Sequence, residues 1–257
     1  MDPRPDLSLV IPIYDEAELI ERNIRIVTDY LDARGGTYEV ILSDDGSTDG
    51  TKDILRRVVD EGRRPIRMVE NEVNRGKGSV LTLGLGAANG EVVGFLDADL
   101  EIDVRFVGDL LDALDDEVDI CVGSRALNES AAERSMLRHL AHHGYNTVVR
   151  MFLGTTIKDN SSGIKFFRRA VRDAVVPNVS EIGWGWDVEF LVRSQMEDFR
   201  VREVPIETVE QRLSKVRVFR TALQTLGMIL RLYRQGVRVR PRNRRGDRRP
   251  RSSSAEA

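Results

Sequence analysis

Hydrophobic and polar segments alternate regularly through the first hundred residues. Short apolar runs of strand type are each followed by a polar loop and then by a segment whose apolar residues have helical spacing. The strand-like runs cover residues 7–13, 38–42, 66–69 and 92–96. This alternation predicts βαβ units and an α/β fold with a mostly parallel, doubly wound sheet flanked by helices.

The second half of the chain continues the alternation with less regular spacing. Strand-like runs cover residues 120–123, 164–167 and 201–206, and helical patterns cover residues 104–114 and 136–152. A further helix is expected after Gly183, with Asp187 in its first turn. In open α/β sheets ligands bind beyond the carboxyl ends of the strands, so the polar residues that follow the strands are the candidate site.

The last helical segment carries a continuous apolar stripe flanked by arginines. Its apolar residues are spaced by three and four positions, as an amphipathic helix requires. They are Val216, Phe219, Leu223, Leu226, Leu230 and Tyr233. Packing on the domain, packing on a second subunit and lying on a membrane surface are all compatible with this stripe. The Arg-rich segment that follows favours the membrane, because stable anchoring needs an apolar and a basic signal together.

Composition divides the chain into an acidic body and a basic end. The length of 257 residues and the hydrophobic content of 41% predict one globular domain with appendages. The net charge is −3, but residues 234–257 carry +7 and the remainder carries −10. We expect a domain at residues 1–213, an amphipathic helix at 214–236 and a basic disordered tail at 237–257. The acidic body argues against nucleic acid as a partner, and the tail suits anionic lipid headgroups.

Cysteine content and hydropathy indicate the compartment. Cys121 is the single cysteine and lies in an apolar run, so we expect a reducing environment. The N-terminal residues lack the apolar core of a signal peptide, and no stretch reaches 18 apolar residues. These features predict a cytoplasmic protein that does not span a membrane.

Three carboxylates follow the fourth strand-like run, with one residue between successive members. In an extended chain this spacing places Asp97, Asp99 and Glu101 on one side. Clustered carboxylates repel each other unless a cation lies among them, and hard oxygen ligands suit Mg²⁺ or Mn²⁺ carrying substrate phosphates. The cluster therefore predicts a divalent metal on a diphosphate, whereas a plain polar turn is the simpler interpretation of the same residues.

Two common nucleotide-binding motifs are missing. The first strand is followed by Tyr14-Asp15-Glu16 rather than by the Gly-x-Gly-x-x-Gly of a dinucleotide-binding loop. A P-loop requires a glycine where Asn71 stands and a serine or threonine where Gly78 stands. A dehydrogenase and a P-loop nucleotidase are therefore disfavoured.

Five ordered motifs together resemble family 2 glycosyltransferases with the GT-A fold. They are Ile11-Pro-Ile-Tyr-Asp-Glu16, Asp44-Asp-Gly-Ser-Thr-Asp49, Asn74-Arg-Gly-Lys-Gly78, Asp97-Ala98-Asp99 and Gly123-Ser-Arg125. Later segments are similar to the branch that uses polyprenol phosphates, which includes dolichol-phosphate mannose synthases and dolichyl-phosphate glucosyltransferases. These segments are Asp159 to Gly163, Trp186 to Glu189 and Ser214-Lys215.

The resemblance implies a nucleotide-sugar donor and assigns its binding residues. The positions that match those holding the nucleoside are Pro12, Tyr14, Glu16 and Asp45, and Arg75 or Lys77 is expected to reach the base or ribose. Asp97, Ala98 and Asp99 match the motif that binds the metal and the diphosphate, with Glu101 where relatives often have glutamine. The sequence leaves UDP-glucose and GDP-mannose open as donors, with a slight preference for glucose.

The resemblance also implies a polyprenyl or dolichyl phosphate acceptor. A phosphate monoester has a second pKa of about 6, so it can attack the anomeric carbon without a protein base and invert it. Cationic side chains are then needed to hold it. The matching positions are Arg125 and Arg138, with Arg212, Ser214 and Lys215 as a third contact, of which Arg212 is offset by one residue from the usual pattern.

Other functions remain open at this stage. A family 2 enzyme that acts on a carbohydrate hydroxyl would need a general base, and Asp187 or Glu189 is the candidate. With a phosphate acceptor, Asp187 is instead expected to position the sugar or to cap its helix. A sugar-phosphate nucleotidyltransferase would need a Gly-rich first loop that this chain lacks. A membrane-bound binding module would not need the acidic cluster. We therefore predict a hexosyltransferase of protein glycosylation, with Asp99, Arg125 and Asp187 as catalytic residues, peripheral on the cytosolic face of a membrane.

Overall fold

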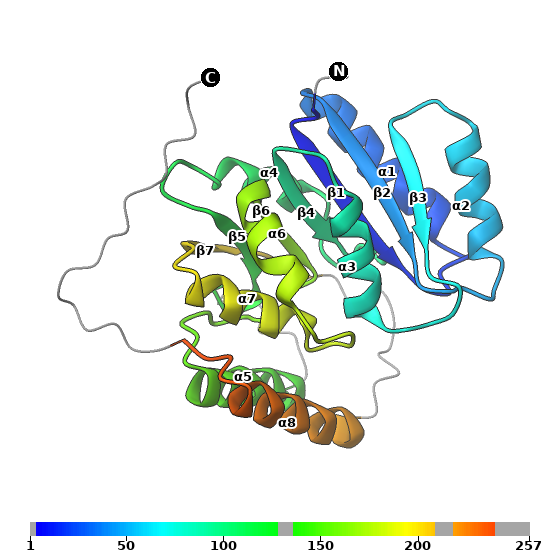
Figure 1. The fold of residues 1–257 in the computed structure, drawn as a ribbon. Helices are drawn as coiled ribbons and strands as arrows, with labels where there is room; N and C mark the ends of the chain where they lie inside the picture. The colour runs from blue at the N-terminus through cyan, green and yellow to red at the C-terminus, as the bar shows by residue number, and fades with distance from the viewer. Residues whose placement is uncertain (1–3, 128–135, 209–217, 240–257) are drawn as a thin grey trace.

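The computed structural model describes residues 4–127, 136–208 and 218–239, with the backbone alone for 136–143 and 218–225. The strands of the described part form one seven-stranded sheet in the order β3-β2-β1-β4-β6-β5-β7 (Figure 1). The strands are β1 (Leu7–Ile13), β2 (Tyr38–Asp44), β3 (Ile66–Glu70), β4 (Val92–Leu96), β5 (Ile120–Ser124), β6 (Ile164–Arg168) and β7 (Val201–Pro205). The mostly parallel α/β sheet predicted from the sequence is confirmed.

Helices cover both faces of the sheet (Figure 1). One face is covered by α1 (Ile20–Arg34), α2 (Thr51–Asp60) and α4 (Arg105–Asp112). The other is covered by α3 (Lys77–Ala87), α6 (Arg169–Val175) and α7 (Trp186–Met196). Because β1 is covered on both faces, all seven of its residues are buried, which is why the strand appears in the sequence as a continuous apolar run. The short helix α6 has no counterpart among the predicted elements.

Strand β6 is antiparallel to both of its neighbours, β4 and β5. The carboxyl ends of β1, β2, β4 and β5 lie at one edge of the sheet, and the reversal of β6 brings its amino end to that same edge. Ile164 pairs with Leu96, so the loop that precedes β6 lies directly beside the residues that follow β4. One reversed strand thus adds residues 159–163 to the edge where the candidate site is expected.

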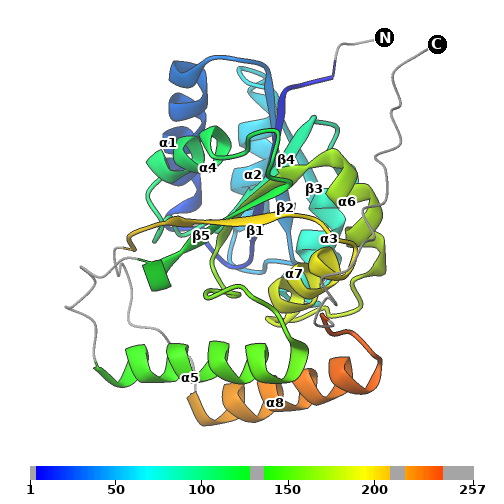
Figure 2. The same cartoon turned by 90° about the vertical axis from the view of Figure 1, so that its left-hand side faces the viewer.

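A third layer lies outside α7. Helices α5 (Met136–Leu153) and α8 (Val218–Arg234) lie side by side on the side of α7 that faces away from the sheet (Figure 2). Ile229 and Leu232 of α8 are buried in a cluster with Val149 of α5 and Val188 of α7. Three members of the predicted stripe, Leu226, Leu230 and Tyr233, are exposed. The side chains of its other members, Val216, Phe219 and Leu223, lie outside the described part of the chain. Helix α8 therefore packs on the domain through one face and presents part of the stripe outward.

Packing continues past the predicted start of the tail. Val237 is buried with the cluster between α5 and α8, and the backbone N–H of Val239 donates to the carbonyl of Leu153 at 2.8 Å. The boundary expected at residue 237 is therefore wrong by three residues, because these residues complete the apolar contact with α5. Residues 240–257 lie outside the described part of the chain.

Among the helices of the described part, none is long and apolar enough to cross a membrane.

Candidate active site

The loops at the carboxyl edge of the sheet are joined by hydrogen bonds. The N–H of Asp45, after β2, donates to the carbonyl of Ile13, at the end of β1, at 2.8 Å. The N–H of Asp97, after β4, donates to the carbonyl of Gly163, before β6, at 2.9 Å. These contacts join the loop after β2 to the end of β1, and the loop after β4 to the loop before β6, at the edge of the sheet where the sequence predicts the site.

Asp45 shapes the loop that begins helix α3. It is 2% exposed, and its Oδ1 accepts hydrogen bonds from the side chain of Asn71 at 2.8 Å and the N–H of Arg75 at 3.0 Å. Its Oδ2 accepts the N–H of Gly76 at 2.7 Å. Both oxygens of Asp45 thus fix the loop at residues 71–76, and the contact of Asp45 with a nucleoside stays a prediction.

The loop after β1 is fastened to the loop after β2. The N–H of Asp15 donates to Ser47 Oγ at 2.9 Å, the N–H of Glu16 donates to Thr51 Oγ1 at 2.9 Å, and the N–H of Thr48 donates to Asp15 Oδ1 at 2.7 Å. Asp15 has a φ of 50°, a left-handed conformation that aspartate adopts more readily than most residues.

These bonds fix the backbone and leave Tyr14 with a half-exposed ring at the edge. A hydrogen bond to Asp15, together with the charge of that carboxylate, raises the pKa of Tyr14, so its hydroxyl stays protonated at neutral pH. Pro12 lies in β1, immediately before the loop. The exposed ring is the part of this group that a base can reach.

The backbone of the acidic cluster, residues 97–101, forms a turn and is not extended. Leu100 has a φ of 50°, its N–H lies 3.4 Å from the carbonyl of Asp97, and the N–H of Glu101 donates to Asp99 Oδ1 at 3.1 Å. Within the described residues, no three acidic, histidine or cysteine side chains converge to hold a metal. The expectation that Asp97, Asp99 and Glu101 share one side is therefore wrong, because it assumed a strand-like backbone.

Asp97 and Asp99 remain a pair with the chemistry of a metal site. Burial raises the pKa of Asp99, and the charge of Asp97 raises it further. A cation between the two carboxylates would relieve this repulsion. Mg²⁺ is usually bound by one or two carboxylates together with substrate phosphates, so a pair is sufficient. The pair fits a divalent metal that arrives with a diphosphate.

Lys77 lies against Asp97. Its Nζ is 2.7 Å from Asp97 Oδ1 and donates a hydrogen bond to Oδ2 at 2.8 Å. Burial would lower the pKa of Lys77, but the carboxylates of Asp97, Asp187 and Asp99 raise it above its usual value. The charge of Lys77 therefore lies beside the acidic pair, and the expected contact of Arg75 or Lys77 with the base or ribose stays a prediction.

Arg125 is a second cation within the electrostatic influence of Asp97. Its Nε donates to Asp159 Oδ2 at 2.8 Å, its Nη2 donates to Asp159 Oδ1 at 3.0 Å, and its N–H donates to Oδ2 at 3.1 Å. Asp159 is fully buried, so this two-pronged contact fixes the plane of the guanidinium. The carboxylates of Asp97 and Glu101 also act on Arg125 and raise its pKa together with Asp159, against the effect of burial.

The remaining predicted acceptor residues lie outside the part of the chain whose side chains are described. Arg138 belongs to a segment of α5 that is described by its backbone alone, and Arg212, Ser214 and Lys215 lie between the described ranges. Their expected roles stay predictions.

A buried ion pair lies below the site. Lys165 of β6 is completely buried, and its Nζ lies 2.5 Å from Asp187 Oδ1 and 2.7 Å from the carbonyl of Ser162. Asp187 is in the first turn of α7, but the helix has no side-chain cap, so the expected capping role is wrong. Its carboxylate is directed to Lys165 instead.

Glu189 is also engaged with its surroundings. It is fully buried and accepts the backbone N–H groups of Ser180 and Glu181 at 3.1 and 2.8 Å and the Nε of Arg193 at 2.7 Å. A general base for a hydroxyl acceptor needs a carboxylate within reach of the substrate. With Asp187 bound to Lys165 and Glu189 bound to the 180–181 backbone, neither candidate base is presented in that way.

Asp159 and Lys165 were absent from the predicted site residues. Lys165 was detectable as a lone charge within the apolar run Ile164-Lys-Phe-Phe167, because lysine is seldom buried without a partner. Asp159 begins one of the segments that carried the resemblance, but its pairing with Arg125 depends on the reversal of β6 and had no signal in the sequence.

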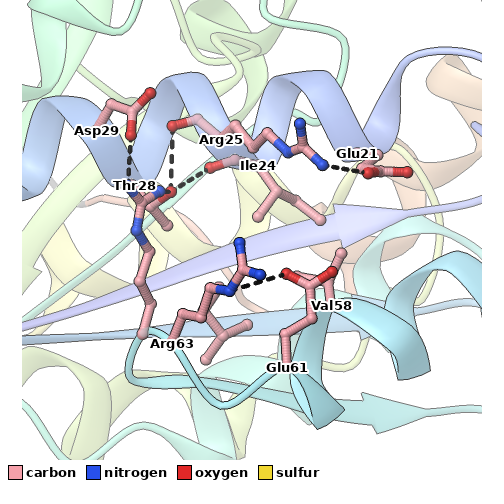
Figure 3. Close-up of a pocket in the computed structure, with 10 residues that line it drawn as sticks. Glu21, Ile24, Arg25, Thr28, Asp29, Val58, Glu61 and Arg63 are labelled. Atoms are coloured by element: carbon pink, nitrogen blue, oxygen red, sulfur yellow. Dashed lines mark hydrogen bonds and ion pairs between the residues drawn. The ribbon is translucent and has the colours of Figure 1, made fainter.

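A groove of about 280 Å³ lies away from these residues. It is formed by α1, α2 and the start of β3, where Arg25 pairs with Glu21 and Arg63 with Glu61 (Figure 3). None of the predicted site residues lines it. Its cations are paired with neighbouring acids, so this groove offers no evident anion site.

The chain is similar to proteins that act on sugars. It is 34% identical to Glycosyltransferase AglD of Haloferax volcanii over 240 residues, which cover 92% of this chain and 38% of that protein. It is 30% identical to the dolichyl-phosphate beta-glucosyltransferases of Saccharomyces cerevisiae and Homo sapiens. These matches cover 82% and 86% of this chain and 69% and 73% of the two relatives.

Solved structures show the same fold. Glucosyl-3-phosphoglycerate synthase from Mycobacterium tuberculosis in complex with UDP superimposes with a TM-score of 0.67 at 22% identity, covering 89% of this chain and 80% of that one. A structure of the same enzyme with Mn²⁺, UDP and glucosyl-3-phosphoglycerate has a TM-score of 0.62, with 93% and 82% coverage. The family model "Glycosyl transferase family 2" matches residues 8–176, well over half of the chain. The chain therefore belongs to glycosyl transferase family 2, as its five ordered motifs predicted.

Proposed function

We propose that this family 2 glycosyltransferase moves a hexose from a nucleotide sugar to dolichyl or polyprenyl phosphate, with inversion at the anomeric carbon. The observation that carries the proposal is Arg125, fixed by a fully buried Asp159 within the electrostatic influence of Asp97. A guanidinium held in one plane beside an acidic pair is suited to a phosphate that must lie next to a diphosphate. An acceptor with a neutral hydroxyl would have no use for it.

The relatives support glucose as the sugar. The yeast and human relatives are named dolichyl-phosphate beta-glucosyltransferases, and each matches this chain over more than four-fifths of its length. We therefore propose UDP-glucose rather than GDP-mannose as the donor. Tyr14 and the loop fixed by Asp45 would receive the uridine, because they form the exposed part of the edge after β1 and β2.

The residues Asp97 and Asp99 would hold Mg²⁺ or Mn²⁺ together with the donor diphosphate. The ion would stabilise, as a Lewis acid, the negative charge that develops on the departing nucleoside diphosphate. Lys77, which already contacts Asp97, would add a second positive charge at the same place. Mn²⁺ in the structures of the mycobacterial enzyme supports a divalent metal in this fold.

The acceptor phosphate needs orientation and charge compensation but not deprotonation. Its second pKa of about 6 leaves it mostly dianionic at neutral pH. Arg125 would hold this dianion in line with the anomeric carbon, and Lys165 would hold the side chain of Asp187 in one position near the sugar. The engagement of Asp187 with Lys165 and of Glu189 with residues 180 and 181 supports the phosphate acceptor over the hydroxyl acceptor.

The enzyme would work on the cytosolic face of a membrane as a peripheral protein. A polyprenyl phosphate is confined to the bilayer, so the enzyme must reach the bilayer surface. The exposed residues of α8 and the basic sequence after Arg234 support such contact.

A donor screen tests this function. The purified chain is incubated with UDP-glucose or GDP-mannose, dolichyl phosphate and Mn²⁺, with Asp99→Asn as the matched control. We expect a glucosylated lipid from UDP-glucose alone, its loss with a chelator, and its loss in the variant. Mannose transfer would overturn the donor assignment, and transfer to phosphate-free dolichol would overturn the acceptor assignment.

A further inference from the structure

An apolar surface runs across the outside of the α5–α8 layer. It consists of exposed side chains from the loop before α7, from α5 and from α8, and we call it the outer face. Its residues are Ile182, Trp184, Met151, Leu226, Leu230 and Tyr233. Trp184 is the most exposed of them at 74%. Soluble proteins seldom leave such large apolar side chains exposed together unless the surface binds a partner.

The three segments of the outer face are in contact. A Cβ added to Gly185 would lie 2.9 Å from the side chain of Met228, so the end of the loop rests on α8. Arg231 of α8 pairs with Glu181 of the loop. The ring of Tyr233 meets the ring of Phe152 of α5 edge-on, with 6.3 Å between ring centroids. The outer face is therefore one continuous surface.

The loop that presents Trp184 is firmly held. Buried Glu189 accepts the N–H groups of Ser180 and Glu181, and the carbonyl of Ile182 accepts the N–H of Ser79 at 3.0 Å. A Cβ at Gly78 would lie 2.6 Å from the carbonyl of Glu181, so only glycine allows this close approach. Several hydrogen bonds therefore hold the loop at residues 180–185 in place, although the side chain of Trp184 within it is exposed.

The charge of the layer identifies the partner. Helices α5 and α8 contain five arginines and no aspartate or glutamate, although the chain as a whole is acidic. Two copies of this face would oppose like charges in a symmetric dimer, which disfavours a second copy as the partner. Tryptophan, tyrosine and arginine around an apolar surface are the residues that suit the interface of an anionic bilayer.

We propose that the outer face inserts into the headgroup region of an anionic bilayer, with Trp184 as its deepest anchor beside the site. The ring centroid of Trp184 lies 5.4 Å from Lys77 Nζ, which is 2.7 Å from Asp97. Insertion of Trp184 therefore brings the acidic pair to the bilayer surface, where a lipid phosphate lies. This inference rests on the proposed function for its purpose, but the binding itself requires neither donor nor acceptor.

Tryptophan fluorescence of the full chain tests the insertion. The chain has two tryptophans, and Trp186 is fully buried between Phe95 and Phe190, so Trp184 is the one that can report a lipid. Vesicles of phosphatidylcholine with phosphatidylserine, free of polyprenyl phosphate, are titrated with and without bromine on the acyl chains. We expect a blue shift and bromine quenching of the wild-type emission, and the loss of both in Trp184→Phe.

Vesicle sedimentation measures the contribution to binding. Trp184→Glu is expected to lower the partition coefficient at least about tenfold, because the variant loses the burial of a large apolar side chain and adds a negative charge that an anionic bilayer repels. Val73→Glu is the matched control, since Val73 is also exposed but contacts Gly46 at the loop after β2, and it should bind as the wild type does.

The results separate this inference from the proposed function. Binding without quenching would mean that the basic tail alone holds the vesicle, and it would overturn the insertion. A second contrary result would be a chain that does not bind vesicles but dimerises with rising concentration, with the dimer lost in Trp184→Glu. That result would assign the outer face to a second copy of the chain and would also overturn the insertion. Quenching by a chain that transfers no sugar would retain the insertion and overturn the proposed function alone.

Discussion

The two halves of the site use their carboxylates differently. In the half after β1 and β2, which we propose binds the donor, Asp15 and Asp45 accept hydrogen bonds mainly from backbone N–H groups and so fix the course of loops. In the half around β5 and β6, which we propose binds the acceptor, Asp159 and Asp187 bind Arg125 and Lys165 and so fix the position of charges. The first arrangement shapes a surface, and the second orients cations.

The difference follows from the strand directions. Parallel strands end at one edge and leave loops whose N–H groups need acceptors. Antiparallel β6 enters from that edge, so its second residue, Lys165, lies inside the sheet, opposite Phe95 in the β4–β6 register. A lysine at such a position must be paired, which explains the buried pair with Asp187. We therefore expect substitutions in the donor half to disturb the conformation of the loops. Substitutions in the acceptor half are expected to leave a charged side chain without its partner.

Loss of the buried cation should have the largest effect. Lys165→Met leaves the carboxylate of Asp187 buried without its partner, and breaking a buried pair in this way costs about 3–5 kcal/mol of the free energy of unfolding. Urea denaturation measures the loss. The double variant Lys165→Met with Asp187→Leu should recover most of it, because no buried charge remains. A single variant within about 1 kcal/mol of the wild type would contradict the charge-balance view of the acceptor half.

Loss of Asp159 should affect the acceptor selectively. Asp159→Ala frees the guanidinium of Arg125, and charged hydrogen bonds are worth about 1.5–3 kcal/mol, so KM for the lipid phosphate should rise roughly 10- to 100-fold. Steady-state kinetics with each substrate varied in turn measure this. The control is Asp115→Ala, whose exposed pair with Arg202 contributes little. An equal rise in KM for the donor would remove the distinction between the halves.

Loss of Asp45 should affect the donor selectively, as loss of Asp159 should affect the acceptor. Asp45→Ala releases three donors of the loop at residues 71–76, so UDP affinity, measured by calorimetry, should fall about tenfold while KM for the lipid phosphate changes little. Asp45→Asn keeps one acceptor oxygen and should be milder. A larger effect on the lipid phosphate than on UDP would show that the loop serves the acceptor.

The sequence predicted the bounds of strands better than their directions and the side-chain contacts between them. Strand β1 and strand β4 were predicted at their observed bounds because a strand covered on both faces is a continuous apolar run. The direction of β6 left no local trace, so the partnership of Arg125 with Asp159 could not be predicted. Asp97 and Asp99 were proposed from their position after a strand, but the left-handed conformation of Leu100, which ends the extended course of the chain, had no signal in the sequence.

The smallest expected effect is a change in the rate at which a thiol reagent labels Cys121. It lies on β5 opposite Phe166, the neighbour of Lys165, and it is completely buried. Burial raises the pKa of its thiol to about 12, so hardly any thiolate forms at pH 8 and a thiol reagent should leave the folded chain unmodified. If buried charge pairs hold the acceptor half together, Lys165→Met should speed labelling of Cys121, whereas Asp45→Ala should leave its rate unchanged. Equal acceleration by both variants would mean that the two halves open together and share one source of stability.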